Sequence, residues 1–376
     1  MQMGLLTKHA SEEQRAELGD AILNGMMIGA SYWNVQLAAI YLPYSQAYCT
    51  SARQQYEVNM ILAEAKYRAM EIATNGAWYY PPACNDEEAY PARFWNPLTV
   101  PEFLQGTPPI TALADLGEKE ALLALQYAEL IKSDMAMYLS RHLLAKIYIT
   151  RKTQREECRI LLDRCVLIAK QADNSSMLGS AFTQLGNLST RWDSPVEAEQ
   201  WYRKAEGALT EEDCDATYEL YEGMIGLFRA RNDAESVGKY YQSMVALIKS
   251  QAEVTDRHWQ ILLGYATWQT SQGEYMEALT NIQEAFDYLK EIMLTRTFLK
   301  HDNVGPWHLM EALLSKIQSP DSSDRAIMSS FHETLGELKD YFPSTPPSTQ
   351  VTFPVDSLRS IAFPKPFQIN NRAISD

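Results

Sequence analysis

Pairs of histidine and cysteine are the first side chains to examine for chemistry, because both residue types bind transition metals and take part in catalysis. His301 and His308 lie seven residues apart, with Pro306 between them. That proline interrupts the helix that would align the two imidazoles, and no cysteine or acidic cluster completes a ligand set. Cys158 and Cys165 are also seven apart and share one face of a predicted helix, where we expect them to fill the core. The sequence therefore predicts no metal site.

The sequence motifs of common catalytic and nucleotide-binding folds are absent. The chain has no Walker-type phosphate loop, no GxGxxG after a predicted strand, no HExxH and no GxSxG. The acidic run that ends at Asp215 lacks the ligand spacing of a calcium loop and is expected to form a solvated helix start. We therefore expect a protein that is not an enzyme and that holds no cofactor.

Charge and cysteine content indicate the class of protein. The 376 residues include 48 acidic and 33 basic side chains, a net charge of −15. A surface that binds nucleic acid normally shows a basic excess, so nucleic acid is not expected as a partner. The five cysteines are scattered without a CxxC motif, which is typical of reduced thiols in a cytoplasmic or nuclear protein.

An uncharged run at 21–52 is long enough to span a bilayer. Three amide side chains within it, those of Asn24, Asn34 and Gln36, favour a helix buried in protein over a membrane span. A capping-box pattern at Ser11 and Gln14 opens this first helix, which is predicted to run to about residue 41. A second helix at about 51–74 completes an N-terminal helical pair.

The segment 76–110 differs from its surroundings because it interleaves seven prolines with many aromatic residues. It cannot be a continuous helix, and its aromatic content disfavours simple disorder. Two interpretations stay open: an ordered insertion that packs on the rest of the protein, and a loop that binds a partner.

A helical hairpin is predicted at 179–209, where two short amphipathic helices are joined by a turn at Asp193 and Ser194. Ser194 is the expected N-cap of the second helix, Pro195 its first residue, and Glu197 the residue that closes a capping box. A third capping box is expected at Thr153 and Glu156. A hairpin of this size cannot bury its apolar face alone, so similar hairpins must stack on it.

The hairpin resembles the tetratricopeptide repeat family in a set of residues at characteristic offsets: Phe182, Leu185, Gly186, Ala198, Tyr202 and Ala205. A second copy matches at Gly273, Tyr275, Ala278, Ile282 and Ala285, and Ala266 stands where the family often has glycine. Weaker copies at 140–169 and 215–248 give a repeat of about 40 residues. Small residues such as Gly186 and Ala198 are expected at close helix contacts.

The resemblance implies an all-α fold, a right-handed α-α superhelix of antiparallel hairpins. We expect an N-terminal helical pair (1–75), the insertion (76–110), repeats with C-terminal capping helices (111–342) and a proline-rich tail (343–376). The tail is extended by its prolines yet apolar, and we expect it to dock on its own repeats rather than to stay free for a partner.

In this family the first helix of each hairpin lines a concave groove that holds a peptide or a helix. The resemblance places there a set of mostly polar residues: Ser180, Thr183, Asn187 and Arg191 in the first copy, and Gln260, Leu263 and Thr267 in the second. Chaperone-binding members clamp a terminal carboxylate with basic residues and asparagine. Asn187 matches one such position, but Thr183 stands where that clamp needs lysine.

Three arginines, Arg151, Arg191 and Arg229, fall at matching places of successive repeats. They could form a basic ladder that binds carboxylates. Equally, each could pair with a local glutamate such as Glu222.

Three function classes follow. The leading one is a non-enzymatic scaffold or adaptor that binds a linear segment of a partner protein in the groove. The second is a peptide-sensing regulator whose superhelix changes shape on binding, as in bacterial peptide receptors of similar layout. The third is an enzyme with an unrecognised site in the N-terminal region.

Overall fold

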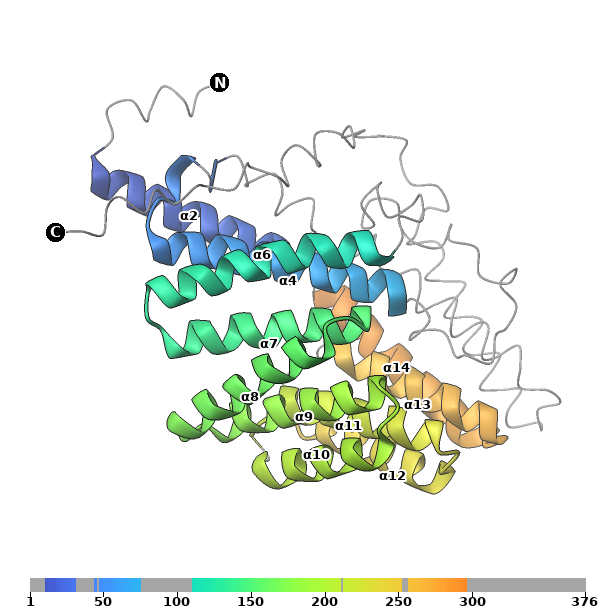
Figure 1. Ribbon diagram of the computed structural model, residues 1–376. Coiled ribbons are helices and arrows are strands. Elements are labelled where there is room, and N and C mark those ends of the chain that lie inside the picture. The colour runs from blue at the N-terminus through green and yellow to red at the C-terminus, as the bar shows by residue number, and fades with distance from the viewer. Residues whose placement is uncertain are drawn as a thin grey trace. The chain divides into compact units, whose positions relative to one another are not determined.

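The computed structural model describes residues 11–31, 44–45, 47–75, 110–210, 212–251 and 256–295. These residues form eleven α-helices and no strand, and neighbouring helices pack in succession along the chain (Figure 1). The predicted all-α class is confirmed for this part, and the arrangement is compatible with a helical-repeat fold. The helices are α2 (Glu12–Ser31), α4 (Ala52–Asn75), α6 (Ile110–Leu130), α7 (Asp134–Arg151), α8 (Arg155–Gln171), α9 (Ser175–Arg191), α10 (Pro195–Ala208), α11 (Cys214–Ala230), α12 (Ala234–Lys249), α13 (Asp256–Gln272) and α14 (Tyr275–Thr295).

Two compact units divide the chain. Among the described residues, unit 1 contains α2, α4 through Met70, α6 and the start of α7 through Ser140. Unit 2 contains the rest of α7 from Arg141 and the helices α8 to α14. The predicted groove residues all belong to unit 2.

Two helices of unit 1, α2 and α4, begin with reciprocal caps. Ser11 N–H donates to Gln14 Oε1 at 3.0 Å, and Gln14 N–H donates to Ser11 Oγ at 3.2 Å, which is the predicted capping box. Ser51 and Gln54 form the same pair of bonds at the start of α4. The amide of Gln54 also donates to Asp20 Oδ1 and so joins α4 to α2.

A buried ion pair joins α4 to α6 within unit 1. Lys66 Nζ lies 2.8 Å from Glu120 Oε1, and the two side chains are only 10% and 6% exposed. Burial lowers the pKa of Lys66 and raises the pKa of Glu120, while their mutual attraction opposes both shifts. Glu120 Oε2 is buried without a hydrogen-bond partner. This unsatisfied atom makes the pair costly to disrupt.

Six interhelical turns share one backbone form. In each, a residue with positive φ follows the helix, and the next N–H bonds to the carbonyl five residues back, which is the Schellman arrangement. In the hairpin α9–α10, for example, Asp193 has φ 56° and Ser194 N–H donates to Ser189 O at 2.9 Å. The six residues are Lys132, Lys152, Asp173, Asp193, Asn232 and Gly273. Only the last is glycine, so the repeated turn is hard to find in the sequence.

The hairpin α9–α10 closes around Tyr202. A Cβ built on Gly186 would lie 2.3 Å from Tyr202 Cε1, so the ring packs directly on the backbone of α9. A Cβ on Gly223 of α11 would also lie 2.8 Å from the same ring. The expected close contact at Gly186 is confirmed, and Tyr202 fills the space between two glycine backbones.

The alanines of the predicted hairpins lie in the core. One core cluster runs from α10 to α14, and its alanines are fully buried: Ala198, Ala205, Ala266, Ala278 and Ala285. Cys158 and Cys165 are likewise buried, and burial raises the pKa of each thiol to about 12. Both cysteines belong to the core, as predicted.

Two of the expected capping boxes are wrong. Gln154, in the left-handed conformation, caps α8 without a side-chain bond, and the Thr153 hydroxyl is buried without a partner. Ser194 also makes no side-chain cap, although Pro195 does begin α10. Glu197 bonds Arg159 and Trp201 instead. Ion pairing and the Schellman turn override the local capping pattern at these places.

Several predictions lie outside the described residues: the extension of α2 to residue 41, the insertion before α6, the pair His301 and His308, the last helical pair and the tail at 343–376. The handedness of a superhelix and the predicted domain boundaries stay predictions. Within the described ranges, no helix combines the length and the apolar character needed to cross a bilayer.

Candidate partner-binding face

The first helices of successive hairpins in unit 2 are α7, α9, α11 and α13. On α9, polar residues recur at spacings of four, three and four: Ser180, Gln184, Asn187 and Arg191. This spacing places them on one side of the helix. We call the corresponding side of α7, α9, α11 and α13 the first-helix face.

A row of polar residues crosses the first-helix face from helix to helix. Lys146, Gln184, Glu219 and Arg257 occur once in each first helix, separated by 38, 35 and 38 positions. Lys146 Nζ lies 2.8 Å from Glu219 Oε1, and Gln184 Nε2 donates to Glu219 Oε2 at 3.1 Å. Arg257 pairs with Asp215, one turn before Glu219 on α11. We call these four residues the polar row.

Glu219 is the acidic centre of the polar row. Burial acts to raise the pKa of its carboxyl, but the charges of Lys146 and His142 and the bond from Lys146 lower it to about 2. The side chain still exposes 32% of its surface. Glu219 is therefore a carboxylate at any physiological pH, and a carboxylate with so low a pKa is a poor general base.

His142 lies beside this ion pair on α7. Burial and the charge of Lys146 lower its pKa to about 4, although Glu219 and a hydrogen bond to the backbone of Ser180 favour its protonated form. The imidazole is thus neutral at pH 7. Together, His142, Lys146 and Glu219 form a fixed set of charges and dipoles that is suited to recognition by hydrogen bonding.

Asn187, a predicted groove residue, is tied into its own hairpin. Its Nδ2 donates to Gln184 Oε1 at 3.1 Å, and its Oδ1 accepts from the Tyr202 hydroxyl at 2.7 Å. The Thr190 hydroxyl lies 3.3 Å from the same Tyr202 oxygen. These bonds fix the orientation of Asn187 and Gln184 on the first-helix face.

Two other predicted groove residues are buried. Thr183 has no exposed surface, and its hydroxyl has no hydrogen-bond partner. Leu263 belongs to the core cluster. Ser180, Gln260 and Thr267 are half-buried on α9 and α13. Whether any of these residues contacts a partner stays a prediction.

The three predicted arginines occupy the last turns of α7, α9 and α11. Arg151 is half-buried, Arg191 is exposed and donates to the carbonyl of Thr150 at 3.2 Å, and Arg229 is half-buried. Arg229 Nη2 donates to the Tyr241 hydroxyl at 2.6 Å, and its guanidinium lies 5.5 Å from the centre of that ring. Glu222 is exposed and lies seven residues, about two helical turns, before Arg229 on α11.

Sequence reasoning missed His142 and all four residues of the polar row. The signal that could have revealed the row is the recurrence of polar residues near 38 positions within otherwise apolar helices. In the described residues, no group of three or more histidine, cysteine or acidic side chains could hold a metal ion.

Comparison with known proteins adds little. No family model matches the chain, and no curated protein is significantly similar to it. One similar solved structure is the crystal structure of BtubC (BKLC) from P. vanneervenii, with 13% sequence identity and a TM-score of 0.38. The similarity covers 65% of this chain and 92% of that chain. A TM-score of this size carries no argument, so the description of this chain rests on its own succession of packed helices.

Proposed function

We propose that the chain is a non-enzymatic adaptor that holds a linear segment of another protein along the first-helix face of unit 2. The observation that carries this proposal is the polar row, because polar side chains of four successive first helices form hydrogen bonds or ion pairs with another first helix. Apolar residues are sufficient to pack the helices of a repeat protein, so packing alone does not require the polar row. Buried polar groups also cost stability unless they form hydrogen bonds or ion pairs.

The row would bind an extended backbone rather than a compact surface. It contains both donors and an acceptor: the Lys146 ammonium, the Gln184 amide and the Arg257 guanidinium donate, and the Glu219 carboxylate accepts. An extended segment presents N–H and C=O groups and side chains at regular intervals, which is the pattern that repeat proteins can match from one helix to the next. Bonds within the row fix the side chains before binding, which lowers the entropy cost of association.

Site-specific photocrosslinking tests the proposal. A photoreactive residue is placed at Ser180 on the first-helix face of the full chain, and a matched one at Gln200, which is exposed on the second helix α10. Both proteins are irradiated in lysate, and the crosslinked products are identified by mass spectrometry.

We expect one protein to crosslink from position 180 and not from 200, and its crosslinked peptide to come from a single linear segment. The same products from both positions, or products from 200 alone, would contradict the proposal. A Glu219→Gln change should weaken the crosslink at 180 because it removes the central charge of the row.

A further inference from the structure

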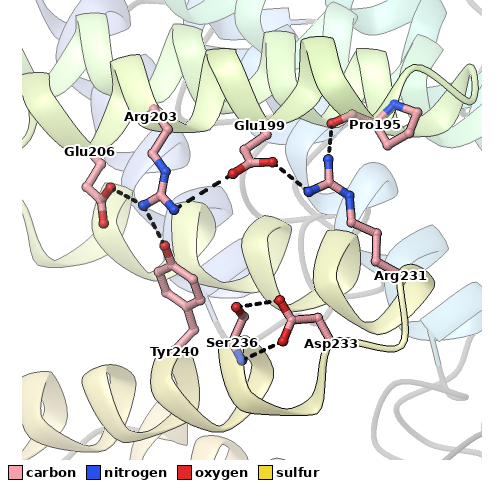
Figure 2. Close-up of polar contacts among 8 residues, drawn as sticks. All are labelled: Pro195, Glu199, Arg203, Glu206, Arg231, Asp233, Ser236 and Tyr240. Atoms are coloured by element: carbon pink, nitrogen blue, oxygen red, sulfur yellow. Dashed lines mark hydrogen bonds and ion pairs between the residues drawn. The ribbon is translucent and has the colours of Figure 1, made fainter.

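The arginines of unit 2 differ in whether they have a carboxylate partner. On the second-helix side, Arg203 pairs with Glu206 and Glu199, and Arg231 pairs with Glu199 and donates to the carbonyl of Pro195 (Figure 2). Arg159 on α8 and Arg257 on α13 also have acidic partners. Acidic side chains outnumber basic ones in this chain, 48 to 33, so most arginines are expected to have a carboxylate nearby.

Arg229 lacks such a partner among the described residues although it is half-buried. Its hydrogen bond goes to the Tyr241 hydroxyl, and its guanidinium lies over the ring of Tyr241. Burial raises the pKa of Tyr241, the charge of Arg229 lowers it, and the charge of Glu222 adds a smaller rise. A partly buried guanidinium without a carboxylate is a cation whose charge no ion pair neutralises.

The position of Arg229 is also fixed. Tyr241 is buried and stacks on Tyr265 at 5.2 Å between ring centres, with 15° between the planes. Tyr241 therefore cannot turn away, and it holds the guanidinium in one orientation. A single last-turn arginine is explained by the helix dipole alone, but that role requires neither burial nor an aromatic support.

Arg191 ends the preceding first helix and likewise has no ion pair within the described ranges, since its hydrogen bond goes to Thr150 O. Arg191 follows Gln184 by seven residues on α9, and Arg229 follows Glu219 by ten residues on α11, so each arginine lies two to three turns beyond the polar row. Two successive repeats thus present a guanidinium at the same end of this face.

We infer that Arg229, supported by Tyr241 and assisted by Arg191, binds an acidic side chain of the partner segment. A guanidinium offers two parallel N–H donors that match a carboxylate. Because the protein is strongly acidic, long-range electrostatics would repel an acidic segment, and only a local cationic site can select it. This inference rests on the proposed function and adds the chemistry of the partner.

The test uses a display library of random linear dodecapeptides selected on the full chain. Selected peptides are labelled and their dissociation constants are measured by fluorescence anisotropy. The variants are Arg229→Gln, Arg229→Lys and Arg191→Gln, with Arg231→Gln as the matched control, because Arg231 is two residues away and already paired with Glu199. Melting temperatures check that each variant folds.

We expect selected peptides to contain Asp or Glu. Arg229→Gln should weaken their binding about ten- to hundredfold, which is the effect of losing a charge-assisted hydrogen bond. Arg229→Lys should weaken it less, and Arg231→Gln should leave it unchanged. Replacing the acidic residue of the peptide by its amide should reproduce the loss on the wild-type protein, which remains a valid test if the Gln variant fails to fold.

The two proposals fail in different ways. A library that yields no binder, or binders that crosslink only to position 200, would overturn the proposed function and the inference with it. Neutral peptides that crosslink to position 180 and bind Arg229→Gln as well as wild type would overturn the inference alone.

Discussion

Replacing Gly186 by alanine tests how the hairpins pack. The new Cβ would lie 2.3 Å from Tyr202 Cε1, 2.5 Å from Cδ1 and 2.8 Å from Cζ, whereas ordinary contacts of this kind exceed about 3.4 Å. The ring would have to move by roughly 1 Å. Gly223 on its other side leaves little room, and the Tyr202 hydroxyl is bonded to Asn187.

Overpacking of this kind costs about 1–3 kcal/mol, and the double contact of the ring favours the upper part of that range. Alanine regains up to about 1 kcal/mol because it is a better helix former than glycine. The expected net loss of stability is therefore about 2 kcal/mol. Gly226 is the matched control: a Cβ there meets nothing within 4 Å, so Gly226→Ala should stabilise by about 0.5–1 kcal/mol.

Urea unfolding of the full chain, followed by hydrogen exchange of peptides from α9 and α10, measures both changes in unit 2 itself. In a Tyr202→Ala background, Gly186→Ala should become neutral or stabilising because the ring is gone. If Gly186→Ala is neutral in the wild-type background, or if Gly226→Ala is equally harmful, the proposed packing of Tyr202 is wrong.

Two further predictions concern buried charge. Lys66→Met should destabilise unit 1 by about 3–5 kcal/mol because it leaves Glu120 buried and unpaired. Adding Glu120→Leu should recover most of that loss. Urea unfolding measures both variants, and equal losses of stability in the single and double variants would refute the buried ion pair. The folded-state pKa of His142, about 4, lies below its ordinary value of 6.5, so the unfolded chain binds more protons between these limits and stability should fall by up to about 3 kcal/mol as the pH drops through this window. His142→Gln should flatten the dependence of the unfolding free energy on pH in this window. The contribution of Glu219, whose pKa is lowered to about 2, is lost only below about pH 4.5. An unchanged pH dependence in His142→Gln would contradict the lowered pKa of His142.

The sequence was sufficient to predict the hairpin because its signals are local. Pro195 can begin a helix but not continue one, and the glycine at 186 opposite the aromatic residue at 202 predicts close packing. The capping of α8 was not predictable, because Lys152 and Gln154 adopt positive φ without being glycine. Lysine and glutamine have no preference for positive φ, so the residue types do not predict that conformation.

The candidate site was harder to predict for a geometrical reason. Counting consensus positions selected Thr183, but the neighbouring residue Gln184 makes the contact to Glu219, and one residue on a helix is a rotation of about 100°. Both residues are buried, so the rotation changes which neighbouring helix the side chain meets rather than its exposure. The pairing of Lys146 with Glu219 spans 73 residues and depends on how three helices are rotated against one another, which no local pattern specifies.

A charge exchange between the protein and a selected peptide tests the central claim most directly. The dissociation constant is measured by fluorescence anisotropy for wild type and Arg229→Glu, each with an acidic peptide and with the same peptide carrying Lys in place of its acidic residue. Direct recognition predicts that Arg229→Glu loses the acidic peptide and regains binding to the lysine peptide, with a coupling between the two changes of at least about tenfold in affinity. If both proteins rank the two peptides in the same order, Arg229 does not contact the segment and the account of this face is wrong.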